Sequence, residues 1–224
     1  EGALHANFSE NESGYLKAYF YNSERGLPGG TILYNEGAFT SQRMWDNTFF
    51  VQSHYENHFS KLFSMQLNAK YHHGYLHYLD TVVLNSAGFE ESYFTQNEYY
   101  ASASLLYKAF TNISFSFSTD ASVNNMFAQF ENAALTESFA QPVRYSLLSV
   151  LAAKYVSENV LATASVLSTL VTETVENGTA ADNRKRLSPY ASVTYKPFDE
   201  TDLRFRAFYK NIFRLPTFND LYYA

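Results

Sequence analysis

The side chains most suited to chemistry lie close together between residues 71 and 80. Three of them are histidines, His72, His73 and His77, and Asp80 follows. Imidazole nitrogens and carboxylates are common ligands of transition metals, so one hypothesis is a site for a metal or a metal chelate. In an extended chain, however, successive side chains point to opposite faces. His72 and His73 would then diverge, and we expect no bound metal.

No catalytic motif accompanies these histidines. The sequence has no Gly-x-Ser-x-Gly, no phosphate-binding loop and no His-Glu-x-x-His, and these are the patterns that would indicate particular reactions. It has no cysteine, which excludes disulfides and thiol chemistry. The acids Asp80, Glu90 and Glu91 lack the ligand spacing of a calcium site. We therefore expect no enzyme activity, no catalytic residue and no cofactor.

The same region is better suited to holding a ligand without covalent chemistry. Tyrosine pairs an apolar ring with a hydroxyl group and is therefore frequent at interfaces and on ligand-contacting loops. We expect a long loop over residues 74–94 whose ligand-binding side chains are Tyr75, His77, Tyr78, Asp80 and Tyr93. Further long loops are expected at residues 22–42, 120–141 and 175–187.

Alternating apolar and polar residues indicate the strands that must position these loops. In the clearest case Phe63, Met65, Leu67, Ala69 and Tyr71 alternate with polar side chains, which places the two sets on opposite faces of an extended chain. A shift of one residue would turn Lys70 toward the apolar side. Residues 1–13 show no pattern. Nine strands are predicted, at residues 14–21, 44–56, 62–72, 96–108, 113–118, 143–156, 160–173, 190–196 and 203–210.

The strand at 203–210 has one apolar and one cationic face. Arg204, Arg206 and Lys210 share a face with Phe208, whereas the opposite face is apolar. Such a strand suits a wall between hydrocarbon and water. We expect these three cations, together with Lys70, to face a water-filled lumen and to pair with charges on neighbouring strands.

The connections between the predicted strands alternate between long and short. This asymmetry is typical of outer-membrane β-barrels, which have short periplasmic turns and long extracellular loops. Aromatic residues beside the short turns would form a periplasmic girdle. A soluble β-sandwich would also alternate, but its strands are usually about 5–6 residues long, and those predicted here have mostly 10–14. The girdle residues are Tyr55, Phe59, Tyr107, Phe110, Tyr155, Tyr195 and Phe198.

Composition agrees with this interpretation. Aromatic residues make up 18% of the 224 residues, a share typical of proteins with large interfaces. No run of about 18 apolar residues would form a membrane-spanning helix. The net charge of −6 argues against binding of nucleic acid. No signal peptide opens the chain, and we expect it to be a fragment of a longer protein.

The segment Phe213–Tyr222 resembles a motif of TonB-dependent outer-membrane receptors. The residues that carry the resemblance are Arg214, Pro216, Thr217, Phe218, Leu221 and Tyr222, with Asp220 between them. The segments 19–29 and 42–52 resemble barrel strands of a vitamin B12-type receptor group common in Bacteroidetes. The resemblance implies that Phe213–Tyr222 belongs to the barrel wall. Pro216 lacks an N–H group, so we expect strand pairing to break there.

The resemblance also implies an architecture and a function. The expected fold is all-β, with residues 1–224 forming about nine strands of a 22-stranded transmembrane β-barrel whose plug domain and remaining strands lie elsewhere. The expected location is the outer membrane of a Gram-negative bacterium, and the expected partners are membrane lipid, a small-molecule ligand and TonB, acting through the plug. Corrinoids are the first expected ligand, ferric siderophores or haem the second, and glycans or peptides the third. A porin-like or adhesin barrel without a plug is the alternative.

Overall fold

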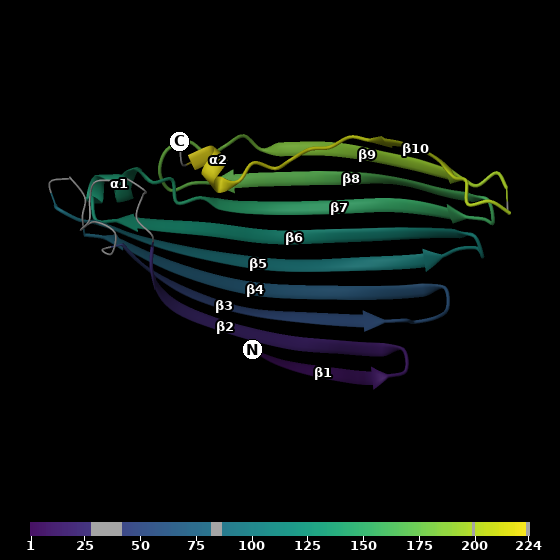
Figure 1. Cartoon of the computed structure of the whole chain (residues 1–224), viewed down its shortest axis with the longest axis horizontal. Coiled ribbons are helices and arrows are strands. Elements are labelled where there is room, and N and C mark those ends of the chain that lie inside the picture. The colour runs from purple at the N-terminus through teal and green to yellow at the C-terminus, as the bar shows by residue number, and fades with distance from the viewer. Residues whose placement is uncertain (28–41, 82–86, 199, 223–224) are drawn as a thin grey trace.

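The computed structural model describes residues 1–27, 42–81, 87–198 and 200–222, which form one open sheet of antiparallel strands. Its order is that of the sequence, so each strand pairs with the next (Figure 1). The strands are β1 (Gly2–Ser9), β2 (Glu12–Gly26), β3 (Arg43–Asn57), β4 (Phe63–Asp80), β5 (Glu90–Lys108), β6 (Ile113–Phe130), β7 (Val143–Val156), β8 (Val160–Thr174), β9 (Arg184–Tyr195) and β10 (Phe205–Lys210). Two short helices, α1 (Ala133–Ser138) and α2 (Phe218–Tyr222), complete the described elements. The prediction of an all-β, antiparallel fold is confirmed, and the open sheet fits a part of a barrel.

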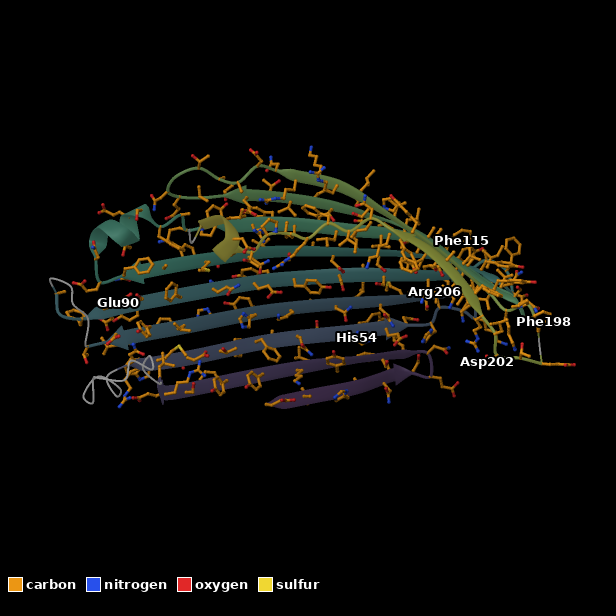
Figure 2. The ribbon with its side chains drawn as sticks, turned by 45° about the horizontal axis from the view of Figure 1, so that its top comes forward. His54, Glu90, Phe115, Phe198, Asp202 and Arg206 are labelled. Atoms are coloured by element: carbon orange, nitrogen blue, oxygen red, sulfur yellow. The ribbon has the colours of Figure 1, made fainter. Side chains whose placement is uncertain are left out.

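The predicted alternation of connections holds from β1 to β9. The turns after β1, β3, β5 and β7 are short and lie at one end of the sheet, and the longer connections after β2, β4, β6 and β8 lie at the other (Figure 1). The prediction of a short turn after β9 is wrong, because residues 196–204 separate β9 from β10, a connection as long as the one after β4. Figure 2 shows Phe115 and Phe198 at the short-turn end and Glu90 at the opposite end. None of the helices in the described part of the chain is long and apolar enough to cross a membrane.

The strand pairing gives the sheet two chemically different faces. Phe63 pairs with Tyr107 and Asp80 with Glu90, without a break in register between β4 and β5. Because side chains alternate, this register gathers large apolar residues on one side. This apolar face carries Phe63, Met65, Leu67, Ala69 and Tyr71 of β4 and Tyr99, Ala101, Ala103, Leu105 and Tyr107 of β5. The polar face carries Ser64, Gln66, Asn68, Lys70 and His72 of β4 and Glu98, Tyr100, Ser102, Ser104 and Lys108 of β5.

The burial of its side chains indicates that the polar face is the concave side of the curved sheet. Side chains crowd together inside a curved sheet and spread apart outside it, and the buried polar side chains of the described strands all lie on the polar face. By contrast, many large side chains of the apolar face are exposed, such as Tyr99 at 53% and Leu151 at 62%. The molecule therefore reverses the usual arrangement of a soluble protein. The buried polar residues are Asp80, Ser92, Arg144, Ser146, Thr169, Glu173 and Ser188.

Two predictions about strand limits are wrong. Residues 2–9 form β1, which pairs with β2, so the described residues contain ten strands rather than nine. The strands also extend far into the regions predicted as long loops, because backbone pairing continues where the alternation of side chains weakens. Residues 74–80 and 90–94 belong to β4 and β5, β6 continues to Phe130, and β9 begins at Arg184. Most of the predicted loop at 22–42 lies outside the described residues.

Candidate functional site

The polar face carries cross-strand pairs of charged and hydrogen-bonding side chains. Lys70 Nζ lies 3.2 Å from Glu98 Oε2 on the neighbouring strand. The Tyr100 hydroxyl donates to Asp120 Oδ1 at 3.1 Å. Asn68 bonds to both neighbouring strands: its Oδ1 accepts from His54 Nδ1 at 2.7 Å, and its Nδ2 donates to Ser102 Oγ at 2.9 Å. These pairs form a polar surface suited to contact with polar groups.

The other predicted lumen-facing cations lie near the short-turn end. Arg206 and Lys210 share the polar side of β10, opposite Thr194 and Tyr190 of β9. Arg204 precedes β10 and forms an exposed ion pair with Asp202, 2.7 Å away. Arg206 and Lys210 therefore occupy the same face as Lys70, whereas Arg204 pairs within its own turn.

A buried ion cluster lies on the polar face near the end with the long connections. The Glu173 side chain is only 1% exposed. Its carboxylate accepts hydrogen bonds from Arg144 Nε at 2.7 Å and Arg184 Nη1 at 3.0 Å. Arg144 Nη2 is 2.6 Å from the same oxygen, but its N–H groups do not point along a hydrogen bond. One carboxylate thus balances two guanidinium groups, which leaves the cluster with net positive charge.

The segment Phe213–Tyr222 leaves the sheet and returns to this cluster. Just before this segment, the Asn211 amide still donates to the Pro189 carbonyl, and α2 then lies over β7 and β8 (Figure 1). The Arg144 guanidinium is 4.6 Å from the centre of the Phe218 ring, and the Tyr222 hydroxyl donates to Glu173. The expectation that this segment belongs to the wall is wrong. Strand pairing ends at Lys210 rather than at Pro216, where the break was expected.

The motif residues explain why α2 begins where it does. Thr217 is the N-cap, and its hydroxyl accepts a bond from the Asp220 amide at 3.2 Å. In return, Asp220 Oδ2 accepts bonds from the Thr217 amide at 2.7 Å and its hydroxyl at 2.9 Å. This reciprocal arrangement is a capping box, preceded by Pro216, which cannot continue a ladder. Arg214 is exposed and Leu221 half-buried.

Two groups of this segment have shifted pKa values. Hydrogen bonds from the Thr217 backbone and side chain lower the pKa of Asp220. Burial raises the pKa of the Tyr222 hydroxyl, and its hydrogen bond to Glu173 raises it further. Both shifts favour the protonation states that hold α2 against the polar face at neutral pH.

The predicted ligand residues of 74–94 do not form one site. Tyr78 and Asp80 lie on the polar face, where Asp80 is buried and accepts a bond from Gln42 Nε2 at 2.7 Å. Tyr75, His77 and Tyr93 lie on the apolar face. The five residues belong to strands rather than to a loop, so their alternation divides them between the two sides.

The three residues on the apolar face join a ladder of stacked rings. His77 lies between Trp45 and Tyr93, with ring centres 4.4 Å away on each side and interplanar angles of 16° and 14°. Tyr75 is 6.4 Å from Tyr93. His77 Nε2 also lies 2.8 Å from Glu91 Oε1. The ladder crosses β3, β4 and β5 near the end with the long connections.

Beside this ladder is a hollow of about 810 Å³ between β4, β5, β6 and α1. We call it the rim hollow. Tyr75 and Tyr93 are the predicted ligand residues that line it. None of the other lining residues was singled out in the sequence, although all but Thr95 fall within the loop predicted at residues 120–141. These are Thr95, Phe127, Ala128, Gln129, Phe130, Glu131, Thr136, Glu137 and Gln141.

The histidines of 71–80 diverge, as the alternative hypothesis expected for His72 and His73. His72 lies on the polar face, paired opposite Phe50 and Glu98, and His73 on the apolar face, where its Nδ1 is 2.8 Å from Asn97 Oδ1. His77 belongs to the aromatic ladder. Within the described ranges, no three His, Asp or Glu side chains are arranged to hold a metal ion.

Comparison with known proteins does not identify a family. No protein-family model matches the chain, and no curated protein matches it either.

Proposed function

We propose that this chain is part of the wall of an outer-membrane transporter of the TonB-dependent type. The observation that carries the proposal is the distribution of side chains over the curved sheet. Charges and amides are inside, and large apolar residues are exposed outside. This arrangement is expected of a barrel that encloses water and contacts lipid.

The height of the apolar face supports a membrane location. One aromatic row contains Phe63, Tyr107 and Phe115 beside the short turns, and a second contains Tyr71 and Tyr99, eight residues further along β4 and β5. At about 3.4 Å per residue the rows are about 27 Å apart along a strand. A strand tilt of about 40° would reduce this to about 21 Å, near the apolar band of about 25 Å in such barrels.

Polar side chains begin immediately above the second row. Tyr71 and His73 both contact Asn97 Oδ1, at 3.1 and 2.8 Å. Asn97 in turn donates through its side-chain amide to Asn125 Oδ1 at 3.0 Å. A chain of hydrogen bonds on the otherwise apolar face suits the boundary between hydrocarbon and head groups.

In the proposed mechanism, the long connections capture a scarce, large ligand, which then passes along the polar interior. A plug held within the barrel would contact the polar face and would be displaced by TonB. No bond in the ligand is made or broken. Corrinoids remain the first expected ligand and ferric siderophores or haem the second, on the basis of the resemblance described above.

The test is equilibrium binding to the full-length protein, extracted from the outer membrane in detergent. Cyanocobalamin, a ferric siderophore and haem are the three probes. Nanomolar affinity for one of them, about −12 kcal/mol, together with uptake that stops when the proton-motive force is dissipated, would support the proposal. Recovery of the protein in a soluble fraction, without detergent, would refute it.

A further inference from the structure

We propose that the rim hollow binds a neutral oligosaccharide. This inference rests on the proposed function in one respect, since it requires the end with the long connections to be exposed outside the cell. The site lies on the apolar face, beyond the second aromatic row. It is therefore separate from the polar interior through which a transported ligand would pass.

The aromatic walls of the rim hollow suit the flat faces of sugar rings. Tyr75, Tyr93 and Phe127 contribute rings from three successive strands. The C–H groups on the faces of a pyranose ring pack against aromatic rings, whose faces carry partial negative charge. The volume of about 810 Å³ lies within the usual range for small-molecule sites, about 300–1,000 Å³.

The polar groups of the rim hollow suit hydroxyl groups and oppose anions. Gln129 supplies an amide, and Glu131 and Glu137 supply carboxylates. The Gln141 amide and the Thr136 hydroxyl also line the hollow, but they are hydrogen-bonded to the backbone of Ala128 and Phe130 and hold the wall in place. Carboxylates and amides accept hydrogen bonds from sugar hydroxyls, and amides also donate them. The described lining contains no lysine or arginine, so phosphate, sulfate or uronate groups would meet two negative charges without a counterion.

The Tyr93 ring is fixed before a ligand arrives. One of its faces stacks on His77 at 4.4 Å, and its hydroxyl hydrogen-bonds the Glu91 carboxylate, which also contacts His77. A ring held by two neighbours loses little conformational entropy on binding, which favours affinity. This arrangement is what a binding platform requires and is not needed for contact with fluid lipid.

The sugar has two possible sources, and their shared chemistry is a neutral glycan. One is a free oligosaccharide from the medium, and the other is the sugar portion of a surface glycolipid beside the barrel wall. The experiment therefore uses the detergent-extracted full-length protein in two arms. In the first, maltotriose, cellotriose and tri-N-acetylglucosamine are titrated by calorimetry, with trigalacturonate as the anionic comparator. In the second, lipopolysaccharide that copurifies is quantified by mass spectrometry.

The variant Tyr93→Ala should weaken binding of the neutral sugar about tenfold, as expected for the loss of one aromatic contact. Tyr99→Ala is the matched control, because Tyr99 is on the same strand and face but does not line the hollow. Since Tyr93→Ala could also disturb the ladder, Glu137→Lys is the second variant. Glu137 is exposed on α1, and this substitution should allow trigalacturonate to bind.

Loss of neutral-glycan binding, or of copurifying lipopolysaccharide, in Tyr93→Ala but not in Tyr99→Ala would support the inference and would identify the source. If neither neutral sugars nor lipopolysaccharide bind, or if trigalacturonate binds best to the unaltered protein, the inference is wrong. Neither result would affect the proposed transport function, which depends on membrane extraction and on uptake. Recovery of a soluble protein that still binds maltotriose would instead refute the transport function alone.

Discussion

The stability of the variant Ala103→Arg should distinguish a membrane-embedded barrel wall from a sheet in water. Ala103 lies on the apolar face, midway between the two aromatic rows. Arginine at the midplane of a barrel wall destabilises the folded state by about 2–4 kcal/mol. The folding equilibrium should therefore shift by roughly 30- to 900-fold toward the unfolded state. In a sheet whose apolar face meets water, the same arginine would cost about 0.5 kcal/mol or less.

Two neighbouring positions serve as controls. Ser104 is the next residue and lies on the polar face, opposite Gln66 and Ser118, so Ser104→Arg should cost little. Thr95 shares the apolar face but lies above the second aromatic row, and Thr95→Arg should cost about 0–1 kcal/mol. The assay is urea unfolding of the full-length protein in thin-bilayer vesicles, followed by tryptophan emission. Trp45, the single tryptophan of this chain, lies in the aromatic ladder.

The membrane hypothesis is tested by ranking the three variants by their loss of stability. The membrane hypothesis requires Ala103→Arg to be the most destabilising, Thr95→Arg to be intermediate or neutral, and Ser104→Arg to be neutral. If Ser104→Arg destabilises as much as Ala103→Arg, the assignment of the two faces is wrong. If all three are neutral, the apolar face does not contact hydrocarbon.

Three further predictions concern the polar face and α2. In the same urea assay, Glu173→Ala should destabilise the fold by about 3–5 kcal/mol, because it leaves buried Arg144 without its counterion. The control is Lys70→Ala, which removes a part-exposed ion pair and should cost about 1 kcal/mol or less. Tyr222→Phe should speed amide exchange at Ala181, whose N–H bonds the Tyr222 hydroxyl at 3.2 Å, with Tyr209→Phe as the control. The pKa of Asp220 is lowered on folding, so the ionised carboxylate stabilises α2 above the pKa of an ordinary aspartate, and this stabilisation is lost as the pH falls through the lowered value. The protection factor of the Thr217 amide, which is its exchange rate relative to an unfolded chain at the same pH, should therefore fall in acid, and Asp220→Asn should abolish this pH dependence.

The strands and their faces could be predicted because hydrophobic alternation is a direct consequence of extended geometry. The pattern around Leu67 and Ala69 placed Lys70 correctly on the polar face, and the order of long and short connections followed from turn-forming residues. The strand ends were harder to predict. Between residues 74 and 80 both faces carry Tyr and Leu, because above the aromatic row neither side contacts a uniform environment. Backbone pairing with β5 continues there regardless of side-chain type.

The contacts of the C-terminal motif could not be predicted from periodicity. The capping box of Thr217 and Asp220 is visible in the sequence as a threonine followed three residues later by an acid. The docking of α2 on the polar face cannot be read from the sequence. Arg144 and Glu173 are far from α2 in the chain, and only the arrangement of β7 and β8 brings them to Phe218 and Tyr222. The rim hollow was missed for the same reason, since its residues come from four separate elements.

The strictly sequential order of the sheet has a kinetic consequence. Each strand pairs only with its neighbours in the chain, so the sheet can grow by adding one hairpin to an existing edge. Turns such as the one after β1 close a loop of very few residues, which keeps the entropy lost at each step small. We therefore expect the sheet to assemble strand by strand, starting at any hairpin. The unpaired edge strand of the growing sheet is the template for the next strand, and it is also the part of the intermediate most prone to pair with another chain.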